Sequence, residues 1–170
     1  MKTLLLSVLT FVSVIAFGQG DKSQRPSPPA LAKETLTNGA TISIDYSQPA
    51  VKGRTIGQDL EPKDGEVWRT GANEATVFET DKDIKVEGKS LPAGKYGLFT
   101  LVNGNEWTII FNKTWKQWGA FNYKEADDVL RVKVTASKSA SFAERMTFTI
   151  GKDGKVSLMW GDRLVVFVIN

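Results

Sequence analysis

The sequence predicts an all-β protein, an antiparallel β-sandwich of jelly-roll-like topology with about eight or nine strands. Short segments alternate between apolar and polar residues, which is typical of half-buried strands. Turn residues separate these segments at short intervals. No long segment has the periodicity of an amphipathic helix.

The first residues have the order of an export signal. A single charge at Lys2 precedes an apolar run from Leu4 to Phe17, and small residues follow at Ala16 and Gly18. The run is too short for a membrane span, which needs about 20 apolar residues. We therefore expect residues 1–18 to be a signal peptide cleaved near Gly18, although a buried N-terminal helix or strand is the alternative. The mature protein is then expected in the periplasm or outside the cell, in soluble form.

Residues 19–35 are expected to be an extended linker, because Pro26, Pro28 and Pro29 interrupt any regular hydrogen-bond ladder. This segment would be either a free tether or an edge segment lying on the domain. Residues 36–170 are expected to form a single domain, which is long enough to bury a core.

The strands of the first half follow from alternation. Residues 40–47 place Ile42, Ile44 and Tyr46 on one face. A long loop over 50–66 has no periodicity, and loops of this length are often functional. Further strands are expected over 75–80, 84–86, 95–102 and 106–112.

Residues 113–127 break the strand pattern. Trp115 and Trp118 are three residues apart, so we expect a loop with one short helical turn that brings them to one side. Strands are expected again over 128–135, 144–150, 155–160 and 163–169. Gly161-Asp162 predicts a type II′ turn between the last two, and the apolar residues on both faces of 163–169 predict a central strand.

The composition excludes several classes of function. The chain has no cysteine and no histidine, which excludes disulfides, thiol nucleophiles, Ser-His-Asp triads and ordinary zinc, copper or haem sites. We expect no catalytic residue, cofactor or metal, and any metal would be a hard cation on oxygen ligands. The formal net charge is +3 with interspersed signs, which indicates no nucleic-acid partner.

The stretch 65–76 has more polar chemistry than a strand needs. Its candidate ligand-binding residues are Trp68, Arg69, Thr70, Asn73 and Glu74. An arginine beside a tryptophan presents a fork of donors to a carboxylate, phosphate or sugar hydroxyl. The alternative is structural, with Trp68 filling the core and Arg69 in an ion pair.

Three further residues are candidates. Trp115 and Trp118 could stack on sugars or other flat ligands, or instead cover one edge of the sandwich. Arg54, in the long loop, could join Arg69 in an anionic pocket, although a solvated basic loop is an equal interpretation.

Five motifs in order resemble the bacterial "domain of unknown function 2911" family. They lie at 46–54, 67–76, 91–100, 106–113 and 117–121, and the resemblance runs from about Pro28 to the C-terminus. The resemblance implies an exported bacterial β-rich domain without assigned catalysis. Some relatives carry helical repeats after this domain, so we expect this chain to be the minimal form.

Three hypotheses about function remain. The leading one is a non-catalytic binding module for a small polar or anionic ligand or an envelope glycan. The second is a structural or protein-interaction domain without a small ligand. The third is a hydrolase that uses two carboxylates, for which Glu74 and its acidic neighbours are the available groups.

Overall fold

The structure is a computed structural model that describes residues 21–170, so the expected signal peptide lies outside the described residues. Eleven strands and two short 3₁₀ helices make up this part of the chain. The strands are β1 (Pro29–Thr35), β2 (Thr41–Ser47), β3 (Val67–Trp68), β4 (Thr76–Thr80), β5 (Ile84–Val86), β6 (Lys89–Leu91), β7 (Gly94–Asn103), β8 (Glu106–Asn112), β9 (Asp128–Thr135), β10 (Ser137–Ile150) and β11 (Lys155–Val168). The 3₁₀ helices are η1 (Lys22–Gln24) and η2 (Glu125–Asp127), and neither approaches the length of a membrane span.

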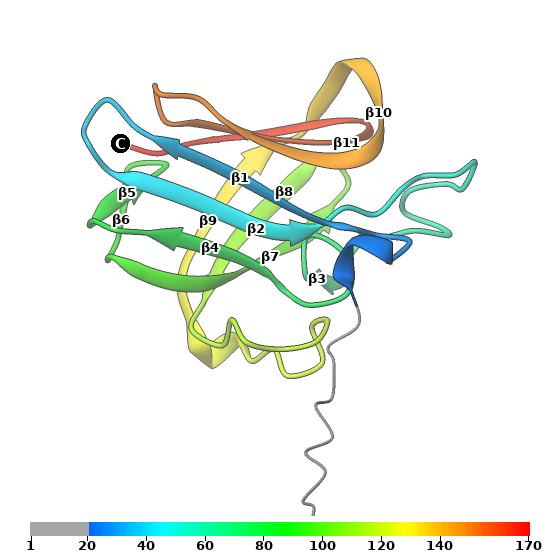
Figure 1. The fold of residues 1–170 in the computed structure, drawn as a ribbon, viewed down its shortest axis with the longest axis horizontal. Coiled ribbons are helices and arrows are strands. Elements are labelled where there is room, and N and C mark those ends of the chain that lie inside the picture. Colours follow the sequence, from blue (N-terminus) through cyan, green and yellow to red (C-terminus); the bar gives the residue numbers. More distant parts are fainter. Residues whose placement is uncertain (1–20) are drawn as a thin grey trace, which may run out of the picture.

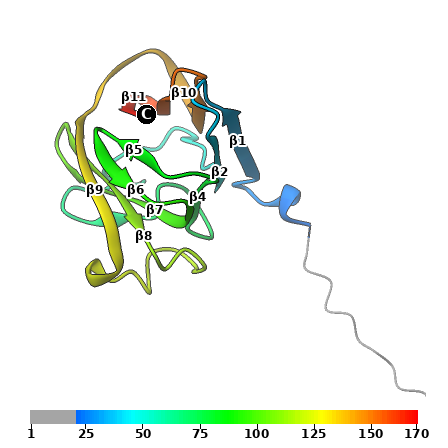
Figure 2. The same ribbon diagram turned by 90° about the vertical axis from the view of Figure 1, so that its left-hand side faces the viewer.

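One large sheet and one ribbon form the two layers. The sheet has the order β1-β2-β4-β7-β8-β9, with β3 added beside β7, and every named pair is antiparallel (Figure 1). The sheet curves from β9 on one side to β1 on the other, and the β10–β11 ribbon lies across the open side (Figure 2). This arrangement confirms the predicted antiparallel all-β sandwich class.

The main core fills the space between the sheet and the ribbon. The predicted inner face of β2 is confirmed, since Ile42, Ile44 and Tyr46 are all buried. Tyr46 packs edge-on against Phe148 of the ribbon, with ring centroids 5.0 Å apart. Burying a side chain of this size contributes roughly 1.5–3 kcal/mol, so the contact between the layers is a main source of stability.

A smaller cluster lies on the opposite face of the sheet. Ala75, Phe99 and Ile110 are buried there, apart from the main core, beneath Tyr123 and Ala120 of the 113–127 loop. Strands β7 and β8 are therefore covered on both faces near their middle. The loop that breaks the strand pattern is consequently packed onto the sheet rather than projecting from it.

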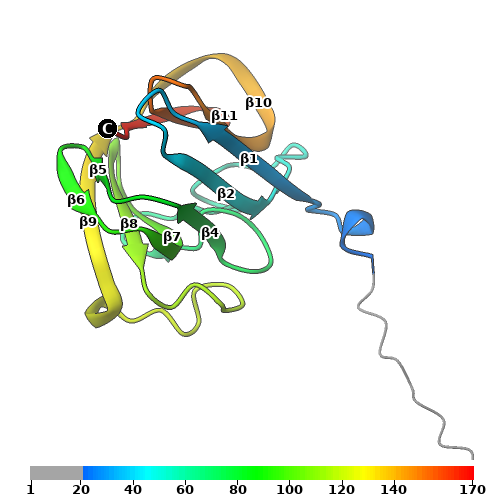
Figure 3. The same ribbon diagram turned by 60° about the vertical axis from the view of Figure 1, so that its left-hand side comes forward.

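The segment expected as a linker contributes an edge strand. Residues 29–35 pair with β2 along their whole length, from Pro29 opposite Ser47 to Thr35 opposite Thr41 (Figure 3). The prolines at 26 and 28 precede the ladder and do not interrupt it. No residue of β1 is fully buried, which explains why its sequence lacks a strong alternating signal.

The turn expected at Gly161-Asp162 is absent, and that prediction is wrong. Residues 155–168 form one strand that pairs with β10, and the segment expected as a central strand has β10 partners only at Arg163 and Leu164. Its end bridges instead from Ile169 to Val86 of β5. Gly161 is a bulge position with φ +63°, opposite Ala143 at a register shift. Glycine is favoured there by the left-handed backbone of the bulge rather than by a turn. A Cβ would also lie 2.5 Å from the end of the Ile56 side chain, which would have to shift.

The hairpin turn between β10 and β11 contains Gly154, whose replacement gives a testable prediction about stability. Gly154→Ala should destabilise the fold more than Gly104→Ala, although both positions have positive φ, at +82° and +59°. Each alanine costs about 1–2 kcal/mol for the left-handed backbone. A Cβ at Gly154 would also overlap the carbonyl of Ile169, whereas at Gly104 it meets nothing within 4 Å, so we expect about 1–3 kcal/mol more loss at Gly154. Urea unfolding measures both values, and equal losses would contradict the packing argument.

Candidate functional site

The stretch 65–76 is divided between core and surface. Trp68 is only 2% exposed, and its indole N–H donates to the carbonyl of Gly71 at 3.0 Å. Thr70 is fully buried, and its hydroxyl donates to the Thr100 hydroxyl at 3.3 Å. These two side chains therefore face the interior, where they hold the loop in place.

This loop has an uncommon backbone. Thr70 has φ +51°, which is a genuine outlier for a β-branched residue. Its carbonyl accepts a hydrogen bond from the Thr76 hydroxyl at 2.8 Å. Gly71 has no room for a side chain, because a Cβ would lie 2.8 Å from that same hydroxyl oxygen. The loop is thus fixed from both sides by buried contacts.

The loop over 69–76 is joined by backbone pairing to the 113–127 loop, which we call the tryptophan loop because it carries Trp115 and Trp118. Glu74 and Trp118 form an isolated antiparallel bridge. The amide of Ala75 donates to the Gln117 carbonyl at 3.0 Å, and the amide of Gly119 donates to the Asn73 carbonyl at 3.0 Å. Two segments more than forty residues apart in sequence therefore form one rigid wall.

A groove of about 480 Å³ lies along this wall. Its lining comes from β2, the N-terminal segment, residues 74–77 and the tryptophan loop: Lys22, Pro29, Asp45, Tyr46, Ser47, Glu74, Ala75, Val77, Trp115, Lys116, Gln117 and Trp118. The structure thus brings together Glu74, Trp115 and Trp118 of the candidate residues.

The two tryptophans differ in exposure. Trp118 is 54% exposed, whereas Trp115 is half-buried. The Lys95 ammonium lies 5.7 Å from the Trp115 ring centroid, and the Arg25 guanidinium lies 5.9 Å from that of Trp118. A cation at this distance from an aromatic ring is attracted to its face. The short helical turn expected in the 113–127 loop is the 3₁₀ helix η2 at the end of that loop, Glu125–Asp127, and not a turn at the two tryptophans.

Glu74 is the charged centre of the groove. Its carboxylate accepts hydrogen bonds from Arg25 at 2.8 and 3.0 Å and pairs with Lys22 at 3.1 Å. Burial alone would raise the pKa of Glu74, but hydrogen bonds from the backbone, Arg25 and Lys22 together lower it below its ordinary value. The group is therefore ionised at neutral pH, whereas a general acid needs a raised pKa.

Lys22 and Arg25 were missed by sequence reasoning. They lie in the segment expected as a linker, where scattered charges have no periodic pattern. The segment is held by further contacts, since the Asn73 amide donates to the Ser27 carbonyl at 3.0 Å. The only available signal was a pair of cations in sequence ahead of the prolines.

Other candidates lie away from the groove. The guanidinium of Arg54 donates to the carbonyls of Val51 at 3.2 Å and Ala50 at 2.8 Å, so it stabilises its own loop. Arg69 does not line the groove either. Within residues 21–170, no group of three or more acidic side chains is placed to hold a metal ion.

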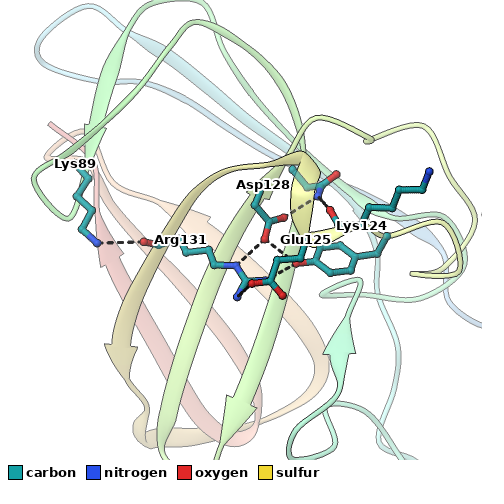
Figure 4. A network of polar contacts seen from close by, with 7 residues as sticks. Lys89, Lys124, Glu125, Asp128 and Arg131 are labelled. Atoms are coloured by element: carbon teal, nitrogen blue, oxygen red, sulfur yellow. Dashed lines mark hydrogen bonds and ion pairs between the residues drawn. The ribbon is translucent and has the colours of Figure 1, made fainter.

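A polar network holds the end of the tryptophan loop to β9 (Figure 4). The Tyr123 hydroxyl donates to Asp128 and accepts from Arg131, both at 2.7 Å. Arg131 also donates to Asp128 at 2.6 Å, and Asn112 of β8 donates to the same carboxylate at 2.7 Å. Burial, followed by the hydrogen bond to Asp128, raises the pKa of Tyr123 to about 12.

Tyr123→Phe should therefore destabilise the protein by about 1–2 kcal/mol at neutral pH, because both hydrogen bonds of the hydroxyl are lost. The raised pKa means that the wild-type stabilisation is present below about pH 10, the pKa in the unfolded chain, and is lost as the pH rises toward 12. Urea unfolding of both proteins between pH 8 and about pH 12 measures this difference. A gap between the two proteins that does not narrow with rising pH would contradict this account.

Sequence comparison identifies the family. No curated protein and no solved structure matches the chain. Residues 27–169 match the family described as "Protein of unknown function (DUF2911)", and this range contains β1 to β11 and every residue that lines the groove except Lys22. Because the match covers most of the chain, the protein belongs to the DUF2911 family.

Proposed function

We propose that this protein is a non-catalytic binding module whose groove takes a short, neutral saccharide stacked on Trp118. The observation that carries this proposal is the exposure of Trp118, at 54%, on the rim of the groove. A large aromatic side chain is normally buried. Leaving it in water beside a hollow is typical of a surface that binds a partner.

The lining has the mixture of groups that a sugar needs. Flat aromatic faces at Trp115 and Trp118 suit the C–H faces of a pyranose ring. Asp45, Glu74 and Lys116 offer acceptors and donors for its hydroxyls. The volume of about 480 Å³ is within the usual range for small-molecule sites, roughly 300–1,000 Å³.

The charges of the groove favour a neutral ligand. Lys22 and Lys116 face the same space as Asp45 and Glu74, so neither sign dominates. The Glu74 carboxylate is already paired with Arg25 and Lys22. A strongly charged ligand would have to displace these ion pairs, whereas a sugar needs only hydrogen bonds from them.

Trp118→Ala should lower saccharide affinity at least tenfold, because the stacking surface is lost, and a tenfold change corresponds to about 1.4 kcal/mol. Phe142→Ala is the matched control, since Phe142 is an exposed aromatic at 61% and lies outside the groove. Calorimetric titration with neutral di- to tetrasaccharides of glucose and N-acetylglucosamine measures the affinities. The proposal fails if no sugar in this panel changes the tryptophan fluorescence or thermal midpoint of the wild-type protein.

We also infer that the protein works outside the cytoplasm. The support is the order of charge, apolar run and small residues over 1–18. Expression of the full chain in a bacterium should yield a mature protein that begins at Gln19, as measured by mass spectrometry of the exported fraction. Leu9→Arg, which interrupts the apolar run, should leave the precursor uncleaved, and a wild-type chain that retains residues 1–18 would refute this inference.

A further inference from the structure

Arg69 differs from the other arginines of the chain. Arg25, Arg54, Arg131, Arg145 and Arg163 each donate at least one hydrogen bond to a carboxylate or carbonyl oxygen. Within residues 21–170, the Nε of Arg69 is buried without any hydrogen-bond partner, and no acidic side chain forms an ion pair with its guanidinium. A half-buried cation without a partner is costly, so its placement needs an explanation.

The backbone around Arg69 is fixed. Trp68 before it is anchored in the core, and Thr70 after it is held at φ +51° by buried hydrogen bonds. Residues in sparsely populated conformations persist where the surrounding structure enforces them, and they cluster at functional sites. The side chain of Arg69 is consequently presented from a rigid point rather than from a mobile loop.

Gly119 and the exposed ring of Phe121 lie next to the guanidinium of Arg69. One Nη of Arg69 lies 3.6 Å from the position that a Cβ of Gly119 would occupy, and the Phe121 ring lies 3.2 Å from the same position. The absence of a side chain at Gly119 thus lets the cation and this ring lie close together on either side of it. Phe121 is 83% exposed, the highest exposure of the large apolar side chains in the described part of the chain.

The electrostatic surroundings compensate the charge of Arg69 only in part. Burial lowers the pKa of Arg69 from its ordinary value, and the opposing effect of the Glu61 carboxylate is smaller. Glu61 forms no ion pair with Arg69 in residues 21–170, and it already accepts a hydrogen bond from the Lys63 amide at 3.0 Å. An anion beside the guanidinium would supply the missing compensation.

We propose that Arg69, Gly119 and Phe121 form a second binding site, separate from the groove, for the carboxylate of a small aromatic acid. The two Nη groups of a guanidinium form a planar fork that matches both oxygens of a carboxylate. Of the Arg69 nitrogens only Nε is buried without a partner, so the two Nη groups are open to the carboxylate. The exposed ring of Phe121 lies close enough to the guanidinium to pack against the ring of the same ligand. Neither Arg69 nor Phe121 lines the groove, so this site does not depend on saccharide binding.

Benzoate is the probe, and benzamide is its uncharged counterpart of nearly the same shape. Titration of the full chain at low ionic strength, followed through the Nε–H resonances of the arginines by NMR, should shift the Arg69 signal with benzoate and leave it unmoved with benzamide. Inorganic phosphate should bind at least tenfold more weakly than benzoate, since it makes no contact with Phe121. An unmoved Arg69 signal at saturating benzoate, or equal shifts with benzamide, overturns the proposal.

Variants separate this site from the groove. Arg69→Lys keeps the charge but loses the planar fork, so benzoate affinity should fall at least tenfold. Arg54→Lys is the matched control, because Arg54 is engaged with its own loop carbonyls, and it should bind benzoate as the wild type does. Trp118→Ala should also keep benzoate affinity, so loss of saccharide binding alone leaves this proposal intact. Equal benzoate affinity in the wild type and Arg69→Lys refutes it.

Discussion

Backbone pairing between residues 73–75 and 117–119 is the constraint on which both surface sites depend. Two amide–carbonyl bonds, which together make up the Glu74–Trp118 bridge, join a loop after β3 to a loop after β8. Neither loop has an extended ladder of its own. Since buried amides and carbonyls need partners, the pairing satisfies the backbone of both loops at once and fixes the side chains that they carry.

The joined loops have two sides with different chemistry. On one side, Glu74 and Trp118 face the groove, where Arg25 and Lys22 neutralise the carboxylate. On the other, Arg69 adjoins Gly119 with no acidic partner in the described chain. The same pairing therefore presents a balanced polar surface and a cation without an ion pair in the described residues, so the two sides suit a neutral and an anionic ligand respectively.

Much of the fold was predictable because alternation reports burial. Strands β2, β5, β8 and β9 match their predicted ranges closely, since one face of each is apolar. Strand β1 has only a half-buried face, on which the small Ala30 and Ala32 contact the core, and Gly161 has the residue type of a turn but the role of a bulge. For the candidate site, the polar stretch 65–76 contributes Glu74 to the groove. The burial of Trp68 and the ion pairs of Glu74 depend on contacts between distant segments, which a local sequence pattern does not contain.

The burial of Trp68 and Thr70 explains why one stretch serves scaffold and surface together. Side chains on consecutive residues of an extended chain point to opposite faces, so anchoring Trp68 inward directs Arg69 outward. The chain then changes direction at Thr70, which has a positive φ and whose buried hydroxyl bonds to Thr100. Glu74 consequently lies on the side of the groove. The polar stretch 65–76, which looks like one site in the sequence, is thereby divided between the core and two faces of the paired loops. A substitution at Trp68 or Thr70 would therefore disturb both faces.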